Sequence, residues 1–161
     1  MKALFLDIDG VITSARIGWF TYDMYTVNYI NWLCEQIDAK VVISSTWRKS
    51  YEKEFFAEYF KYLHDDWRTK SLPRIKMSES VPRGAEIKEW MDRHPDVDDY
   101  LILDDDSDML DSQKDRFVKT DTYNGLMFEH IIKIRNIFSE EMKAQFHSGI
   151  NPNVREPKDS E

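Results

Sequence analysis

Two aspartates lie two residues apart where an apolar run near the start of the chain ends. The run ALFLDIDGVI begins at residue 3 and contains Asp7 and Asp9. Burial disfavours the charged form of each carboxyl group, and two negative charges that lie close together repel each other. Side chains two apart on an extended segment project to the same side, so both carboxylates can face one ligand. A divalent cation there would offset the repulsion and keep Asp7 ionised, as a nucleophile must be.

Two later apolar runs also end in polar side chains that could join this site. The run AKVVISS ends at Ser44 and Ser45, and the run LILDDD places Asp104 and Asp105 near its end. Oxygen ligands suit hard cations, and Mg²⁺ typically takes one or two carboxylates together with water and substrate phosphate oxygens. The sequence therefore predicts a Mg²⁺ site with the ligands Asp7, Asp9, Asp104 and Asp105.

The elements predicted around these residues would bring them to one edge of a sheet. Short apolar and β-branched runs predict strands over residues 3–7, 39–45, 98–106 and 116–121. Apolar residues at helical spacing predict helices over residues 24–39, 49–67, 83–94 and 125–146, with a loop over 69–84. This order indicates an α/β fold with a parallel sheet covered by helices on both faces. In such sheets ligands bind beyond the carboxyl ends of the strands, where each of these polar groups is expected.

Length and composition favour one folded domain outside the membrane. The chain has 161 residues, 42% of them hydrophobic, which suits a single domain with a substantial core. No run approaches the ~18 to 20 apolar residues of a membrane span, and early acidic residues interrupt any secretory signal. Cys34 is the only cysteine, so we expect a reducing, cytoplasmic setting. We predict a folded domain over residues 1–147 and a disordered polar tail over 148–161.

The net charge of −8 argues against tight, non-specific binding to long nucleic acid, which depends on Lys and Arg. This net charge is compatible with a local basic pocket that binds one phosphate. The aromatic residues Trp19, Phe20 and Tyr22 follow Asp9 in a predicted loop. They could stack on a nucleic-acid base or pack against the body as a lid.

Four segments of the chain resemble the motifs of the haloacid dehalogenase (HAD) superfamily: FLDIDGVI, VVISSTWR, a basic residue before a helix, and LILDDD. The finer resemblance is to the small HAD domains of Swiss army knife RNA-repair proteins, through ISSTWR, RGAEIKEW, LILDDDSDM and TDTYNGL. Each motif alone is weak, but four in the right order, over residues 3 to about 126, make a specific signal. The resemblance implies a HAD-like three-layer α/β/α sandwich with a parallel sheet and a minimal cap or none.

By position, the resemblance implies that Asp7 is the nucleophile that forms an aspartyl-phosphate. Asp9 would be the general acid that protonates the leaving oxygen and then the base that activates water. Superfamily members that pass the phosphoryl group to other acceptors often lack this second acid, so Asp9 favours a phosphatase. The chain is thus expected to be a Mg²⁺-dependent phosphomonoesterase.

The resemblance also implies a phosphate-binding hydroxyl and a cation. Ser44 matches the hydroxyl that binds the transferring phosphoryl group, with Ser45 as the alternative, because a sequence does not define strand ends to one residue. Arg83 matches the cation that offsets charge on phosphate and nucleophile, since it opens a helix whose following strand ends at Asp104. Lys88, one turn further on, is the alternative to Arg83.

Further residues complete the expected site. Arg48 would bind a second phosphate or fix its loop. Gly10 would let the backbone turn sharply and approach the substrate closely. Asp104 would hold Mg²⁺ directly or through water, with Asp105 beside it.

The gaps between the motifs are too short for a separate cap domain. There are 34 residues between Asp9 and Ser44 and 37 between Ser45 and Arg83, whereas a folded cap would need ~50 or more. An open site admits bulky substrates such as the phosphorylated end of RNA or DNA, and a nucleotide or another small phosphomonoester stays open as the alternative. The sequence does not determine the oligomeric state.

A different class of protein shares part of this residue set. Receiver-type phospho-acceptor domains also combine a parallel sheet, clustered aspartates, Mg²⁺, a hydroxyl and a lysine. Their acceptor aspartate follows a middle strand, whereas the pair of Asp7 and Asp9 follows the first strand here. A binding module without catalysis is a third alternative, and the complete acidic set argues against it.

Overall fold

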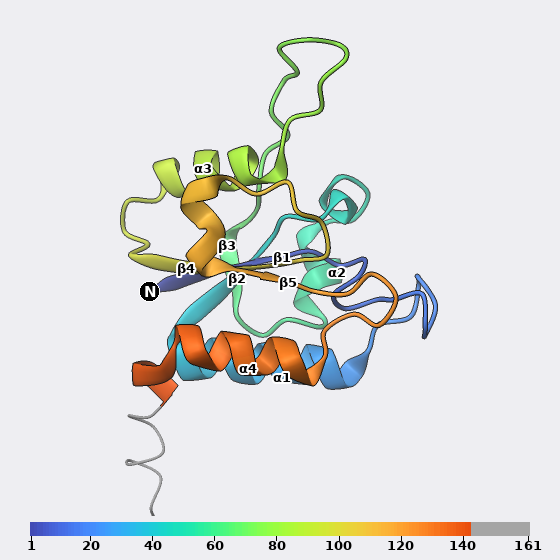
Figure 1. Ribbon diagram of the computed structural model, residues 1–161, viewed down its shortest axis with the longest axis vertical. Coiled ribbons are helices and arrows are strands. Elements are labelled where there is room, and N and C mark those ends of the chain that lie inside the picture. The colour runs from blue at the N-terminus through green and yellow to red at the C-terminus, as the bar shows by residue number, and fades with distance from the viewer. Residues whose placement is uncertain (143–161) are drawn as a thin grey trace, which may run out of the picture.

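Five strands form one sheet, and each strand is parallel to its neighbours (Figure 1). The computed structural model describes residues 1–142. The strands are β1 (Lys2–Leu6), β2 (Ala39–Ile43), β3 (Leu63–Arg68), β4 (Asp99–Asp104) and β5 (Phe117–Lys119). They lie in the order β3-β2-β1-β4-β5, so β1 is central and β3 and β5 form the edges.

Helices cover both faces of the sheet, as the continuous apolar character of the central strands predicts. The helices are α1 (Met24–Ile37), α2 (Lys53–Ala57), α3 (Arg83–Arg93) and α4 (Phe128–Ile137), with 3₁₀ turns at Thr46–Lys49 and Asp111–Arg116. Helices α1 and α4 lie side by side on one face, and α3 lies on the other (Figure 1). Leu4 and Leu6 belong to the core on the first face, whereas Phe5 contacts Trp90 of α3 edge-on at 5.3 Å. This alternation of side chains confirms the predicted α/β sandwich.

The register of β1 brings the ends of three strands to the same level. Leu6 lies opposite Ile43 of β2 on one side and Leu103 of β4 on the other. The pairing continues one residue further, because the amide of Asp7 donates to the carbonyl of Leu103 and the amide of Ser44 donates to that of Leu6. The side chains that follow these strands therefore emerge next to one another at the carboxyl edge of the sheet.

The prediction of one helix over residues 49–67 is wrong. The chain forms the short helix α2 there and then the edge strand β3, while Phe56 and Phe60 are buried in the core. The aromatic spacing fits a helix locally, but β3 pairs with the outer edge of β2 and gives partners to backbone groups on both strands. Tertiary pairing has overridden the local pattern.

The remaining predicted elements are found, with shifted ends. These are the strands predicted over 3–7, 39–45, 98–106 and 116–121 and the helices predicted over 24–39 and 83–94. The helix predicted over 125–146 begins only at Phe128, and α4 ends at Ile137. The boundary predicted at residue 147 and the tail predicted over 148–161 lie outside the described residues.

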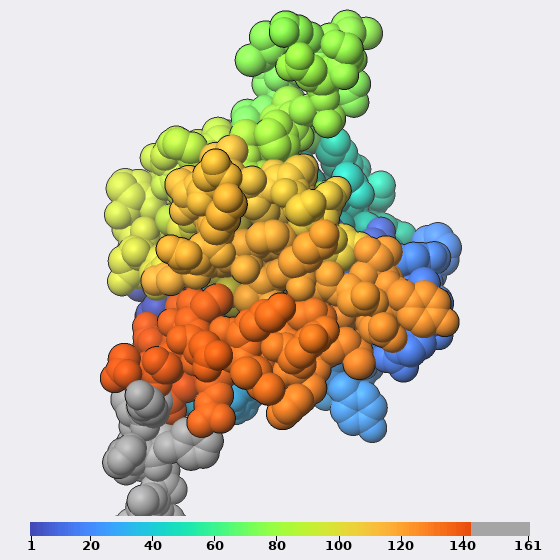
Figure 2. All heavy atoms as spheres, in the orientation of Figure 1, coloured from blue at the N-terminus to red at the C-terminus, as the bar shows by residue number. Residues whose placement is uncertain are grey.

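The connections between the elements hold no separate cap domain within residues 1–142, as predicted. The predicted loop before α3 contains neither helix nor strand from residue 69 to residue 82, and it projects from the body of the protein (Figure 1, Figure 2). In the same described part of the chain, no helix combines the length and the apolar character that crossing a bilayer would require.

Candidate active site

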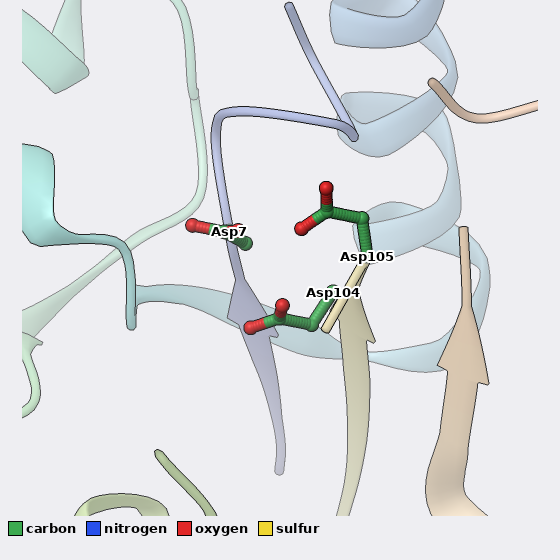
Figure 3. Close-up of side chains that lie close together, drawn as sticks. All are labelled: Asp7, Asp104 and Asp105. Atoms are coloured by element: carbon green, nitrogen blue, oxygen red, sulfur yellow. The ribbon is translucent and has the colours of Figure 1, made fainter. Parts of the chain in front are cut away.

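Three carboxylates meet at the carboxyl edge of the sheet (Figure 3). Asp7 follows β1, Asp104 is the last residue of β4, and Asp105 comes directly after it. One oxygen from each of them lies within 4.8 Å of the others. Within residues 1–142 this is the one group of three or more such side chains that could hold a metal ion.

Burial makes the charges of these carboxylates costly. Asp104 is fully buried, and Asp7 is 6% exposed. Loss of hydration raises the pKa of Asp7, and it raises the pKa of Asp104 to about 8, with the nearby Asp7 charge adding to the effect. The Arg83 guanidinium acts in the opposite direction and lowers the pKa of both groups, but it does not outweigh burial.

Arg83 reaches these carboxylates from the first residue of α3. Its Nη1 lies 3.3 Å from Oδ1 of Asp7, and its Nε lies 3.2 Å from Oδ2 of Asp104. The same Nη1 donates to the carbonyl of Ser44 at 2.6 Å. Asp108 sets the start of the helix, because its Oδ2 accepts a hydrogen bond of 2.8 Å from the backbone amide of Arg83. The arginine is therefore held at both its backbone and its side chain.

The charge balance and the free lone pairs of this group fit a divalent cation. One guanidinium faces three carboxylates, which leaves an excess of negative charge. Oδ2 of Asp104 is buried and accepts no hydrogen bond, since the nearby Nε of Arg83 is outside hydrogen-bond geometry. A buried carboxylate oxygen without a donor is destabilising, and a hard cation satisfies it with the ligand type it prefers. Asp7, Asp104 and Asp105 are the residues that would hold Mg²⁺.

Gly10 makes room for one of these carboxylates. Its φ is +76°, and a Cβ atom at this position would collide with the carboxylate of Asp105. Two threonine hydroxyls maintain the contact: Thr120 donates to the carbonyl of Gly10 at 2.6 Å, and Thr122 donates to Oδ2 of Asp105 at 2.7 Å. The structure thus places Gly10 against a candidate metal ligand, and the predicted contact with substrate stays a prediction.

We expect Gly10→Ala to lower the free energy of unfolding by about 1–3 kcal/mol, because the new side chain is strained at positive φ and displaces Asp105. Denaturant unfolding measures this change. The matched control is Gly18→Ala, since Gly18 also has positive φ, at +101°, but a Cβ there meets nothing closer than 3.5 Å. An equal loss in both variants would show that the contact with Asp105 is unimportant.

Both candidate hydroxyls lie at the end of β2, and they have different surroundings. The Ser45 hydroxyl hydrogen-bonds to Asp7 and lowers its pKa, and it also accepts from the amide of Trp47 at 3.3 Å. The Ser44 hydroxyl is buried and has no hydrogen-bond partner. The side chain of Ser45 is therefore linked to the carboxylate group, whereas the hydroxyl of Ser44 is unpaired.

The carboxylate of Asp9 does not join the group of three. Its Oδ1 accepts from the Thr13 hydroxyl at 2.8 Å, and its Oδ2 accepts from Nε1 of Trp47 at 2.9 Å. Both oxygens are therefore engaged by neutral donors, and the role of Asp9 as a metal ligand stays a prediction. The two donors hold the Asp9 carboxylate in one orientation.

Arg48 fixes its loop, which was one of the two predicted roles. The side chain is 3% exposed, and its nitrogens donate to the carbonyls of Ser44, Ser45 and Thr69. The remaining nitrogen donates to Glu86 at 2.6 Å. Each of its nitrogens is thus engaged within the protein, and a role of Arg48 in binding a second phosphate stays a prediction.

Lys88, the alternative to Arg83, lies away from the carboxylates. Its ammonium is exposed and pairs with Asp92 on the next turn of α3, at 2.6 Å. Arg83 is the first residue of this helix, whereas Lys88 lies more than one turn further along it. The structure thus brings Arg83 to the site and leaves Lys88 outside it.

We expect Arg48→Met to lower the free energy of unfolding by about 3 kcal/mol or more, because it removes the cation that pairs with Glu86 and the side-chain donor to the carbonyl of Thr69 in a buried setting. Lys88→Met is the matched control. It breaks an ion pair whose partners are 59% and 62% exposed, and such pairs contribute at most about 1 kcal/mol. Similar losses in the two variants, measured by denaturant unfolding, would contradict the role of Arg48 as a buried anchor.

Three residues that hold the site together were not singled out from the sequence. Trp47 and Thr13 orient Asp9, and Asp108 positions Arg83. Trp47 and Asp108 do lie in the segments ISSTWR and LILDDDSDM. Their place in these two segments indicates a role at the site. Their partners are distant in the chain, so the sequence alone did not show which residues they contact.

Comparison with known proteins identifies one family. The model of the family described as "HAD domain in Swiss Army Knife RNA repair proteins" matches residues 3–131. No curated protein and no solved structure matches the chain at a significant level. The matched region contains every residue of the carboxylate group, both candidate hydroxyls and Arg83.

Proposed function

This chain belongs to the family of HAD domains in Swiss Army Knife RNA repair proteins, and on that premise we propose that it is a Mg²⁺-dependent phosphomonoesterase. The observation that carries the proposal is the position of Asp7. Its carboxylate lies beside Arg83, and it can share one cation with Asp104 and Asp105. A carboxylate nucleophile needs its negative charge maintained at a buried position, and this arrangement supplies it.

In the first step, an oxygen of Asp7 attacks phosphorus, and the bond from phosphorus to the leaving oxygen breaks. Asp9 donates a proton to that oxygen, so the alcohol leaves neutral. Thr13 and Trp47 keep the Asp9 side chain in place for the transfer. Arg83 stabilises the negative charge on the phosphoryl oxygens. The product of this step is an aspartyl-phosphate on Asp7.

In the second step, water attacks the phosphorus of the aspartyl-phosphate, and Asp9 takes up a proton from that water. The bond between the Asp7 oxygen and phosphorus breaks, which releases inorganic phosphate and restores both carboxyl groups. Bound Mg²⁺ supplies charge neutralisation for the phosphoryl oxygens and for Asp7. The chain's own residues supply the nucleophile, the proton transfers and the second positive charge.

A serine hydroxyl would donate to a phosphoryl oxygen during both steps. Ser45 contacts Asp7, which places it beside the attacking atom. Ser44 has a buried hydroxyl without a partner, and a phosphoryl oxygen would satisfy it. Comparison of Ser44→Ala with Ser45→Ala separates the two assignments. Only loss of the hydroxyl that binds the phosphoryl group should lower the turnover of bound substrate.

We propose that the substrate is the phosphorylated end of a nucleic acid, with a nucleotide or small phosphomonoester as the alternative. The family description and the lack of a cap domain within residues 1–142 support the larger substrate.

A cytoplasmic location is retained as part of the proposal. Cys34 is buried, and burial raises the pKa of its thiol to about 12, which makes it unreactive at neutral pH.

The test is phosphate release from a panel of phosphomonoesters with Mg²⁺, including 3′- and 5′-phosphorylated oligonucleotides, nucleoside monophosphates and glycerol phosphate. We expect hydrolysis, with at least one oligonucleotide end among the best substrates. A phosphorylated intermediate should also turn over within seconds. An intermediate that persists far longer would favour a receiver-type acceptor, and the absence of hydrolysis on the whole panel would end the proposal.

A further inference from the structure

A pocket of about 520 Å³ opens beside Asp9 and is lined largely by aromatic rings. Trp19 and Phe20 come from the loop between β1 and α1, and Trp47 and Tyr51 come from the segment after β2. Because Trp47 donates to Asp9, the aromatic lining is attached directly to the proposed proton donor. We call this space the aromatic pocket.

The rings of the aromatic pocket are left exposed, although similar rings nearby are packed. Phe20 is 88% exposed, Trp19 40% and Tyr51 37%. The rings of Trp47 and Tyr51 are stacked with centroids 5.1 Å apart, and the Phe20 ring lies 6.4 Å from that of Trp47. Exposed aromatic groups gathered around a hollow mark a binding surface more often than a packing fault. Their faces are suited to stacking on a flat, aromatic ligand such as a nucleobase.

A second pocket of about 420 Å³ adjoins the first, and Lys49 lines both. Lys49, Arg68 and Lys70 give this basic pocket three exposed cationic side chains. Lys49 and Lys70 form no ion pair with any residue of the described chain. Thr69 also lines this pocket, and its hydroxyl is buried without a hydrogen-bond partner.

The one carboxylate that lines the basic pocket is already neutralised. Asp66 pairs with Arg93 at 2.6 Å, and its same oxygen lies 3.3 Å from the ring of His94. The basic pocket is therefore a local positive region on a chain whose net charge is −8. Exposed cations that form no ion pair are the partners that a phosphate group requires.

From these two pockets we propose that the leaving group is a single-stranded nucleic acid that departs through a hydroxyl oxygen of its terminal nucleoside, with the terminal base in the aromatic pocket and the internucleotide phosphates in the basic pocket. The inference rests on the proposed phosphatase function, since Asp9 can protonate only a leaving oxygen beside it. A small metabolite would leave both pockets unused. A base-paired end would offer the aromatic pocket no free base face, so single strands are preferred over duplex ends.

The first test compares matched 3′- and 5′-phosphorylated oligonucleotides, as RNA and as DNA, with oligonucleotides whose terminal nucleotide is abasic. We expect kcat/KM to fall about 5- to 150-fold when the terminal base is absent, which is the range for one stacked base. Glycerol phosphate provides the reference rate. Equal rates with and without the terminal base would overturn the assignment of the aromatic pocket.

The second test uses variants at the two pockets. Phe20→Ala should lower the ratio of oligonucleotide to glycerol phosphate hydrolysis. Lys70→Ala should lower the same ratio, and it should reduce the salt dependence of oligonucleotide binding by about 0.7 in the slope of log affinity against log salt concentration. Tyr25→Ala and Lys61→Ala are the controls, because both side chains are exposed and lie outside the two pockets. Equal effects in variants and controls would overturn the proposal.

The two proposals can fail separately. Hydrolysis of glycerol phosphate without any advantage for the oligonucleotide would overturn this inference and leave the phosphatase proposal intact. A free nucleoside monophosphate hydrolysed as well as the oligonucleotide would overturn the assignment of the basic pocket to a strand. If nothing is hydrolysed, the fluorescence anisotropy of a dye-labelled phosphorylated oligonucleotide still measures its affinity for the protein. Equal affinity for wild type, Phe20→Ala and Lys70→Ala would overturn the inference.

Discussion

Replacing Asp7 by Asn should abolish turnover, with kcat lower by a factor on the order of 10³ or more. The amide is nearly the same size as the carboxylate, but it cannot attack phosphorus or hold a cation by charge. The measurements are phosphate release and the label retained on protein from radiolabelled substrate after rapid quenching. We expect no retained label, because the labelled group would be the phosphoryl attached to Asp7.

The fold should survive this change. Burial already raises the pKa of Asp7, so removal of its charge relieves a cost of the folded state and loses one pairing with Arg83. We expect a Tm equal to or higher than that of wild type when no divalent cation is added. Asp65→Asn is the control, because this exposed carboxylate belongs to the edge strand β3 and should leave turnover unchanged. Wild-type turnover by the Asp7→Asn protein would show that another residue is the nucleophile.

Removal of divalent cations by a chelator should lower activity by a factor on the order of 10³ or more, and added Mg²⁺ should restore it. Asp7, Asp104 and Asp105 bring three carboxyl groups together with one guanidinium to offset their charge when they ionise. A bound dication removes that imbalance and completes the charge that the phosphoryl oxygens require. Full activity in the presence of chelator would contradict the assignment of these carboxylates as metal ligands.

The same carboxylates make the stabilising effect of Mg²⁺ depend on pH. The pKa of Asp104 is about 8 in the folded protein against 3.8 for an ordinary aspartate. Between those values, without added cation, the folded chain keeps a proton that the unfolded chain has lost, so stability falls as pH rises. Mg²⁺ binds in place of that proton, and we therefore expect a larger increase in Tm near pH 8 than near pH 5.

Thermal unfolding with and without Mg²⁺ across this pH range measures the effect. In Asp104→Asn the fall in stability between pH 5 and pH 8 should be reduced, because the group with the raised pKa has been removed. Asp92→Asn provides an exposed control that should keep the wild-type dependence on pH and Mg²⁺. A shift of Tm by Mg²⁺ that is identical at both pH values would show that these carboxylates are not the groups it binds.

Much of the fold could be predicted because its strands are short, apolar and buried. Residues 3–7, 39–45 and 98–106 read as strands in isolation, and their parallel arrangement follows from the helices predicted between them. The segment 49–67 could not be assigned in this way. Its aromatic residues meet the core from a short helix and an edge strand alike, and only pairing with β2 distinguishes strand from helix.

The candidate site could be predicted in part. Asp7, Asp104 and Asp105 were expected together because each follows an apolar run, and the register of Leu6 with Leu103 brings them together. The partner of Asp9 could not be predicted, since the Trp47 indole lies 38 residues away along the chain. The roles of Ser44, Ser45 and Arg83 in catalysis stay predictions that the variants above test.

The sequence by itself determined the order of the elements, the apolar faces that bury them and the chemical types at the strand ends. The tertiary structure decided which of those groups meet. It turned Asp9 toward Trp47 and away from the other carboxylates, and it enclosed Arg48 with Glu86. The reason is physical: burial and periodicity are local properties of a chain, whereas a side chain's hydrogen-bond partners and charge environment depend on segments that only packing brings together.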